Sequence, residues 1–349
     1  MIVRLNNTTT SAIAREIDEL HVERGEAAQG RVLTLVIITG DAHLEGALET
    51  INAASREHPC RVIAIVTDAD KHTNTDEKSD RPGTSGSTPA ESDRTLDPDN
   101  RCISYKTARP GGDHTLDAEI RFGSDAGAGE VIVLRPVPAL LDHSDALVIP
   151  LLVPDAPLVV WWPANAPKAP SKDLIGAMAT SRITDAMEAD DPEIAFASLL
   201  EHSGAADVDL SWTRTTIWRA LLASIIDQPP HLPVTSVRVT GQAHFLPLEL
   251  LASWLALKLE VPVTVERDPR AQAITGVYFT RGDGTMSMER HRADQARINQ
   301  PGQASQTISM PLRTAVDCMS EEMGRLDPDE VYQDVISRGW PMVHNRCTR

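Results

Sequence analysis

The sequence is poor in cysteine and in aromatic residues, and it has no long apolar run. Its 349 residues include four Cys, three Tyr, four Phe and six Trp. No stretch reaches the roughly 18 uninterrupted apolar residues of a membrane-spanning helix. The stretch from Met1 to Leu20 has no apolar core of the kind that a secretory signal needs. We therefore expect a cytoplasmic protein.

The four cysteines lie far apart in the sequence and form no CxxC pair. Such spacing argues against a disulfide framework and against a structural zinc site, and it favours a reducing compartment. Their positions are Cys60, Cys102, Cys318 and Cys347. Cys318 falls on a predicted amphipathic helix, where a core or flanking position is expected.

The common catalytic and cofactor signatures are missing as well. The sequence contains no GxxxxGK[ST] phosphate loop, no GxGxxG fingerprint, no HExxH and no GxSxG. The glycine-rich stretch from Gly123 to Glu130 precedes a strand instead of joining a strand to a helix, so we interpret it as a turn. We therefore predict no catalytic, cofactor-binding or metal-binding residue, which lowers the expectation of an enzyme.

The net charge is strongly negative, −17 at pH 7. A chain of this charge repels phosphate backbones and anionic lipid, so we expect neither a nucleic-acid nor a membrane-surface partner. Hydrophobic residues make up 41% of the sequence and charged residues 24%. These proportions are those of a globular protein with a sizeable core.

The first half of the chain has the pattern of an α/β domain. A helix is predicted with Ile13, Ile17 and Leu20 on one face. Apolar β-branched runs predict buried strands, and the helix between the first two strands predicts a parallel βαβ unit. The predicted strands are Arg31 to Thr39, Cys60 to Asp68, Cys102 to Ala108, Thr115 to Phe122, Glu130 to Pro136 and the segment that ends at Trp162. A helix is predicted from Asp41, as its cap, to His58, and another within Val137 to Val153.

A polar segment interrupts this pattern between Asp70 and Asn100. Its only apolar side chains are Ala90 and Leu96. Such a segment buries too little apolar surface to offset the entropy of ordering it, so we predict a disordered insertion. The Pro-rich segment from Ala164 to Lys172 marks the predicted domain boundary. The domains are therefore 1–165, with the insertion at 70–100, and 171–349.

The second half alternates between helices and strands again, so the predicted fold class is two α/β domains with mixed or mainly parallel sheets covered by helices. Helices are predicted at Asp173 to Ala179, Pro192 to His202, Trp212 to Ile226 and Pro247 to Leu259. Strands are predicted at Val234 to Thr240, Val261 to Glu266, Ile274 to Thr280 and Thr285 to Glu289, the last two joined by a hairpin turn at Arg281 to Gly284. Two helices close the chain, and the last has Asp327 as N-cap and Gly339 as stop.

Two adjacent tryptophans, Trp161 and Trp162, stand at the end of a predicted strand. Successive strand residues point to opposite faces, and Pro163 cannot continue a central strand. Either both rings lie in a sheet that is covered on both faces, or one ring meets the other domain or a partner. Trp is an efficient anchor in protein interfaces.

The helix that follows Asp207 combines tryptophan with arginine. Its apolar stripe includes Trp218, and Arg214 lies four residues earlier on nearly the same face. Such an arginine needs a carboxylate, an aromatic face or solvent. Asp209 or Ser211 can cap the helix. The stretch is therefore either a packed helix whose arginine reaches water or a Trp/Arg patch for a partner, which Arg219 on the flank can extend.

These stretches resemble a known family. PDAPLVVWWP is followed by SRITDA, DLSWTRTTIWRALLASIIDQPP, LPLELLASWLALKL and DPDEVYQDVISRG. In this order they resemble the OpcA family of glucose-6-phosphate dehydrogenase assembly proteins of actinobacteria and cyanobacteria. The likeness covers both halves of the chain but not the polar insertion.

The resemblance implies a non-enzymatic partner of glucose-6-phosphate dehydrogenase. Members promote assembly or activation of that enzyme, which stands at the entry to the oxidative pentose phosphate pathway and supplies NADPH. On this hypothesis the chain is an assembly factor or allosteric activator without a cofactor. The candidates for the partner interface, or for its direct support, are Trp161, Trp162, Trp212, Arg214, Trp218 and Arg219.

A second hypothesis makes the chain an α/β enzyme or sensor that binds a phosphorylated metabolite or a nucleotide. Its support is the strand-to-helix turn from Thr39 to His43 and the general affinity of helix N-termini for anions. Thermal-shift measurements with sugar phosphates and nucleotides discriminate between the two hypotheses. A ligand at a hundred times its dissociation constant adds about 2.7 kcal/mol of stability.

Overall fold

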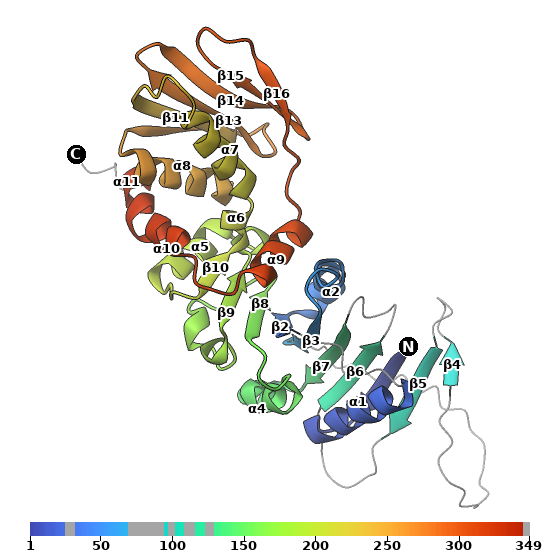
Figure 1. Cartoon of the computed structure of the whole chain (residues 1–349). Coiled ribbons are helices and arrows are strands. Elements are labelled where there is room, and N and C mark those ends of the chain that lie inside the picture. The colour runs from blue at the N-terminus through green and yellow to red at the C-terminus, as the bar shows by residue number, and fades with distance from the viewer. Residues whose placement is uncertain (25–31, 69–93, 97–101, 108–115, 123–128, 345–349) are drawn as a thin grey trace, which may run out of the picture. The chain divides into compact units, whose positions relative to one another are not determined.

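A computed structural model describes most of the chain as two compact units. The described residues are 1–24, 32–68, 94–96, 102–107, 116–122 and 129–344. The first unit is Met1–Trp161 and the second is Trp162–Arg349. Figure 1 shows helices and strands in both units, and the predicted α/β class is confirmed.

The first unit is built on a mixed sheet with the strand order β8-β2-β3-β7-β6-β1-β5-β4. β8, β2, β3 and β7 run parallel to one another, whereas β6 is antiparallel to both of its neighbours. The strands are β1 Ile2–Asn6, β2 Leu33–Thr39, β3 Cys60–Val66, β4 Arg94–Leu96, β5 Cys102–Thr107, β6 Leu116–Phe122, β7 Glu130–Pro136 and β8 Leu158–Trp162. The predicted βαβ unit is confirmed in β2 and β3.

Helices cover the sheet of the first unit. They are α1 Thr10–Arg24, α2 Asp41–Ala54, α3 Pro138–Leu141 and α4 Ser144–Val148, with a 3₁₀ turn at Ile149–Leu151. Figure 1 shows α1 lying across one face of the sheet. Its predicted apolar face is confirmed, because Ile13, Ile17 and Leu20 are buried.

Three local features of the first unit differ from the sequence predictions or lie outside them. Strand β1, which precedes α1, was not predicted; it pairs with β5 and β6, and its short run around Val3 is buried. Gly40, not Asp41, is the N-cap of α2, and the Asp68 carboxylate accepts a hydrogen bond from the Asp41 N–H at 2.6 Å. Within the predicted insertion, β4 is a strand, and the rest of that segment lies outside the described residues.

The second unit holds a mostly antiparallel sheet with the order β12-β11-β13-β14-β15-β16, and its strands β9 and β10 pair in parallel. Its strands are β9 Ser181–Thr184, β10 Asp207–Asp209, β11 Val234–Gln242, β12 Val263–Asp268, β13 Ile274–Arg281, β14 Gly284–Arg292, β15 Gln295–Asn299 and β16 Gln306–Ser309. Its helices are α5 Pro192–Glu201, α6 Leu210–Thr213, α7 Thr216–Ile226, α8 Leu246–Leu259, α9 Ala315–Gly324, α10 Glu330–Asp334 and α11 Trp340–His344.

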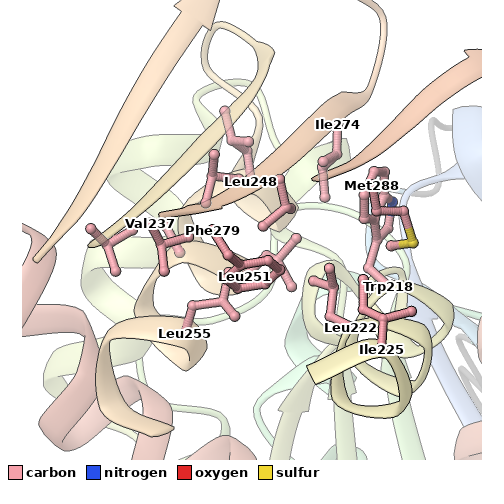
Figure 2. Packing of buried hydrophobic residues seen from close by; sticks show 14 of the residues in the cluster. Trp218, Leu222, Ile225, Val237, Leu248, Leu251, Leu255, Ile274, Phe279 and Met288 are labelled. Carbon is pink, nitrogen blue, oxygen red and sulfur yellow. The ribbon is translucent and has the colours of Figure 1, made fainter. Parts of the chain in front are cut away.

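The core of the second unit lies between this sheet and the helices α7 and α8. Figure 2 shows Trp218 and Leu222 of α7 and Leu251 of α8 gathered with strand residues such as Phe279 and Met288. α8 is apolar almost all round and most of its residues are buried, as its sequence predicts. The hairpin between β13 and β14 is also confirmed, and Gly284 there has a φ of 130°, which favours glycine.

Several short elements of the second unit were not predicted, and one predicted helix is broken. β9, β10, β15 and β16 are short strands that lack a long apolar run. The predicted helix at Asp173 to Ala179 is reduced to a 3₁₀ turn, Gly176–Met178. The predicted helix at Trp212 to Ile226 is divided into α6 and α7, and between them the Thr215 backbone N–H and hydroxyl both donate to the Trp212 carbonyl, at 2.9 and 2.7 Å.

The C-terminal helix begins and ends elsewhere than predicted. Asp329, not Asp327, is the N-cap, and its carboxylate accepts from the Tyr332 N–H at 2.9 Å. Gly339 does not stop the helix, which continues through a π-helical segment, Val335–Gly339, into α11. The glycine is there because its backbone lies against α8: a Cβ at Gly339 would stand 2.6 Å from the Ser253 carbonyl oxygen.

This close approach predicts that Gly339→Ala destabilises the protein. The added methyl group must push α8 and the π-helical segment apart, a cost of about 1–3 kcal/mol. The matched control is Gly46→Ala, because the same added atom meets nothing within 4 Å on the exposed side of α2. Chemical denaturation should show a loss of stability for Gly339→Ala and a gain of up to about 1 kcal/mol for Gly46→Ala. Equal effects of the two substitutions would contradict this interpretation.

Candidate functional site: the Trp212 cluster and the arginine pocket

Of the candidate interface residues, the paired tryptophans at the end of β8 are both buried. Trp161 and Trp162 are each 3% exposed. The ring of Trp162 faces Gly176, where an added Cβ would stand 3.1 Å from the ring. The Trp161 N–H is buried and has no hydrogen-bond partner among the described residues. Neither ring therefore presents its face to solvent.

Trp212 lies at the centre of a cluster of polar and aromatic contacts in the second unit. Its side chain is fully buried, and its Nε1–H donates to Asp329 Oδ2 at 2.8 Å. The guanidinium carbon of Arg219 lies 3.7 Å from the centre of the indole ring, which is cation–π geometry. Tyr332 packs on it as well, with ring centroids 5.8 Å apart. We call these residues, with Asp185, Asp209, Thr213, Arg214 and Glu322, the Trp212 cluster.

Arg214 forms a bidentate ion pair with Asp185. Its Nη1 and Nη2 donate to the two carboxylate oxygens at 2.8 and 2.7 Å, and the Asp185 side chain is only 3% exposed. Burial raises the pKa of Asp185 to about 6, and the bonds from Arg214 oppose this shift. Of the three environments that the sequence left open for Arg214, the structure contains the carboxylate.

Asp209 fixes the backbone that carries this ion pair. Its Oδ1 accepts from the Ser211 N–H at 2.9 Å, so of the two caps that the sequence left open, Asp209 and Ser211, Asp209 is the N-cap of α6. Its Oδ2 accepts from the Thr184 hydroxyl at 2.7 Å and from the Ala186 N–H at 2.9 Å. Asp185 is thereby held between two anchored neighbours, opposite Arg214.

Glu322 of α9 is a buried acid that contacts α6. Its Oε1 accepts a hydrogen bond from the Thr213 hydroxyl at 2.6 Å, and the residue is 2% exposed. Burial raises the pKa of Glu322 to about 7, against the hydrogen bond from Thr213. The acid therefore takes up a proton on folding at mildly acidic pH.

This proton uptake predicts a pH-dependent contribution of Glu322 to stability. Its carboxyl has an ordinary pKa of 4.5 and a folded value of about 7. The folded state thus binds more protons between these values, so stability should fall as pH rises from about 5 to 7. We expect the stability of the wild type relative to Glu322→Gln to drop by up to about 3 kcal/mol over this range. Denaturation curves at pH 5, 6, 7 and 8 measure this difference, and a constant difference would contradict the assignment.

Arg219 completes the Trp212 cluster without a carboxylate partner within ion-pair distance among the described residues. Its Nε and Nη2 donate to the hydroxyls of Thr215 and Thr216 at 2.9 and 3.0 Å. Burial lowers the pKa of Arg219 to about 10, so it stays cationic at neutral pH. Its stacking on Trp212 and its bonds to α7 hold it in one position.

A pocket of about 50 Å³ opens next to the Trp212 cluster in the second unit. Three arginines line it, Arg214, Arg290 and Arg313, together with apolar side chains that include Trp218, Phe245 and Leu312. Trp218 is 3% exposed and belongs to the core as well. Arg214 and Trp218, two of the candidate interface residues, thus meet in one pocket. Arg290 and Arg313 were not singled out from the sequence, because no local pattern places them beside Trp218.

Two of the cysteines, Cys60 and Cys318, have the properties of core residues. Cys60 and Cys318 are free and fully buried. Burial raises the pKa of Cys60 to about 12 and that of Cys318 to about 11. Both thiols are therefore protonated at neutral pH, whereas the thiolate is the reactive form. Among the described residues, no group of three or more His, Cys, Asp or Glu could hold a metal ion.

The fold is that of an α/β protein of two units. In the second unit, the acidic residues of the buried Trp212 cluster accept hydrogen bonds from neighbouring side chains and backbone groups. Two family models match the chain, one over residues 51–201 and one over residues 205–336. They are described as the N-terminal and the C-terminal domain of a glucose-6-phosphate dehydrogenase subunit. The chain belongs to this family, the OpcA family of glucose-6-phosphate dehydrogenase assembly proteins.

Other comparisons add little to this assignment. A search of the curated proteins finds no match. A solved structure of an inositol dehydrogenase homologue from Azotobacter vinelandii, complexed with NADH and myo-inositol, aligns at 10% identity. The alignment covers 54% of this chain and 66% of that chain, with a TM-score of 0.24, which supports no conclusion about fold or function. Among the described residues, no helix has both the length and the apolar character needed to cross a bilayer.

Proposed function

We propose that this chain is a non-catalytic assembly factor and allosteric activator that binds glucose-6-phosphate dehydrogenase and promotes its active oligomeric state. The observation that carries the proposal is the pair of family models, which are described as two domains of one dehydrogenase subunit and follow one another along the chain. In this role the protein acts in the cytoplasm, supports NADPH supply by the oxidative pentose phosphate pathway, and has no nucleic-acid or membrane partner.

The mechanism requires only that the chain bind one state of the dehydrogenase better than another. A ligand shifts a two-state equilibrium by its differential affinity for the two states. About 3 kcal/mol of differential binding changes the ratio of states by roughly a hundredfold. No group of this chain needs to enter the active site of the dehydrogenase.

We assign the six sequence candidates different parts in this binding. Trp161, Trp162, Trp212 and Trp218 are buried, so they act as supports that fix the shape of the surface. Arg214 and Arg219 belong to the Trp212 cluster and are partly exposed. They are the candidates for direct contact with the partner.

Analytical ultracentrifugation of the purified chain with the glucose-6-phosphate dehydrogenase of the same organism tests the proposal. A complex of defined mass, together with a higher oligomer of the dehydrogenase, is the expected result. A parallel thermal-shift panel of sugar phosphates and nucleotides tests the alternative of a metabolite sensor. Stabilisation by one of these compounds, without any complex, would favour the sensor over the assembly factor.

A further inference from the structure

One arginine of the arginine pocket has no carboxylate partner within ion-pair distance among the described residues. Of its three arginines, Arg214 pairs with Asp185 and Arg313 pairs with Glu321. Arg290 of β14 forms no ion pair with any described carboxylate. Its Nη1 donates to two backbone carbonyls, those of Ala293 and Met310, at 2.7 and 2.8 Å.

Arg290 is also incompletely hydrogen-bonded and partly desolvated. Its Nε is buried and has no hydrogen-bond partner among the described residues. Its guanidinium carbon lies 5.6 Å from the centre of the Trp218 ring, inside the distance at which the ring face attracts a cation. An unpaired cation of this kind is costly, and a carboxylate that reaches it would recover much of the cost.

The rim of the pocket is apolar and open to solvent. Leu312 lines the pocket and yet is 49% exposed. Few large apolar side chains among the described residues are exposed to this degree. Together with Trp218 and Phe245 it offers contact area for an aliphatic stem. The pocket thus combines an apolar entrance with a positive charge inside.

The size of the pocket selects among anionic ligands. Its volume of about 50 Å³ compares with about 300–1,000 Å³ for typical metabolite sites. Since a single water molecule needs a cavity of at least about 10–15 Å³, the pocket holds only a few groups of the size of a water molecule. This room suits the charged end of one side chain.

We infer that this pocket receives one acidic side chain, Asp or Glu, of the dehydrogenase, with the carboxylate at Arg290 and the stem against Trp218 and Leu312. The inference rests on the proposed function and adds the chemistry of its contact. Charge complementarity carries it, because in a chain of net charge −17 this pocket keeps a cation without a described counter-ion.

The sharpest test places an acid of the chain itself at the mouth of the pocket. In Leu312→Glu the new carboxylate repels the incoming acid and competes for Arg290. The affinity for the dehydrogenase, measured by isothermal titration calorimetry, should weaken at least tenfold. The matched control is Leu174→Glu, which makes the same change at a leucine of the same unit that is 45% exposed and does not line the pocket. It should bind within twofold of the wild type.

A second pair of variants separates charge from folding. Arg290→Met removes the cation and should weaken binding at least tenfold, whereas Arg290→Lys keeps the cation and should bind within about threefold of the wild type. Both lose bonds to backbone carbonyls, so thermal melts report how far each is destabilised. If the role of Arg290 is purely structural, the affinities of the two variants for the dehydrogenase will follow their melting temperatures and not the charge of the side chain at position 290.

The possible failures are distinguishable. If the wild type forms the complex while Leu312→Glu and Arg290→Met bind equally well, the pocket assignment is wrong and the proposed function stands. If the wild type forms no complex, the proposed function fails and the pocket assignment with it. If glucose 6-phosphate stabilises the wild type but not Arg290→Met, the pocket is a metabolite site and the inference is overturned.

Discussion

Replacement of Trp212 by alanine is expected to lower the free energy of unfolding by about 3–5 kcal/mol, the usual cost of removing a large buried aromatic side chain. The ring is 0% exposed, and three neighbours depend on it. Asp329 accepts from its N–H, Arg219 stacks on its face and Tyr332 packs beside it. The substitution leaves a cavity and removes the aromatic partner of a partly buried cation.

Urea denaturation of the wild type and of Trp212→Ala at pH 7 measures this loss. Trp212→Phe is the control, because it keeps an aromatic ring for Arg219 and removes the hydrogen bond to Asp329. That variant should lose about 1–2 kcal/mol. If Trp212→Ala lost less than Trp212→Phe, Trp212 would not be the centre of the cluster.

Arg214→Ala is the second large expected effect, again about 3–5 kcal/mol, for an electrostatic reason. The substitution leaves the Asp185 carboxylate almost fully buried without its bidentate partner. Leaving one charge of a buried ion pair without its partner destabilises the protein by much more than the intact pair stabilises it. The double variant Asp185→Asn with Arg214→Ala should therefore be less destabilised than Arg214→Ala alone.

The loss in Arg214→Ala should also depend on pH. Burial raises the pKa of Asp185 to about 6 even with Arg214 present, and without the arginine the pKa rises further. Asp185 is then protonated at pH 5 and the desolvated charge disappears. Urea denaturation of the wild type and Arg214→Ala at pH 5 and pH 8 should give a smaller difference at pH 5. A difference that is equal or larger at pH 5 would contradict the buried ion pair.

The elements that sequence reasoning located share one property, a long apolar run or stripe. β2, β3, β7 and β8 are buried along nearly their whole length, and α8 is apolar on most sides. The missed strands have no such run: β16 is mostly exposed, and β9 and β10 contain four and three residues. Their strand conformation comes from pairing with neighbours, which a local pattern does not contain.

The candidate site was predictable in its residue types but not in its pairings. The sequence indicates that Arg214 needs a partner, but Asp185 lies 29 positions away and the Trp212–Asp329 bond spans 117 positions. Arg290 was identified only from the fold, because β14 places it beside Trp218.

The most direct test of the proposed activation is a titration of this chain into a fixed concentration of its glucose-6-phosphate dehydrogenase, with initial rates of NADPH formation and the mass of the complex recorded together. We predict that the rate changes and reaches a plateau at the ratio at which the complex mass also stops increasing, and that the chain alone forms no NADPH. A rate that is independent of added chain, with no complex at any ratio, would contradict the proposal.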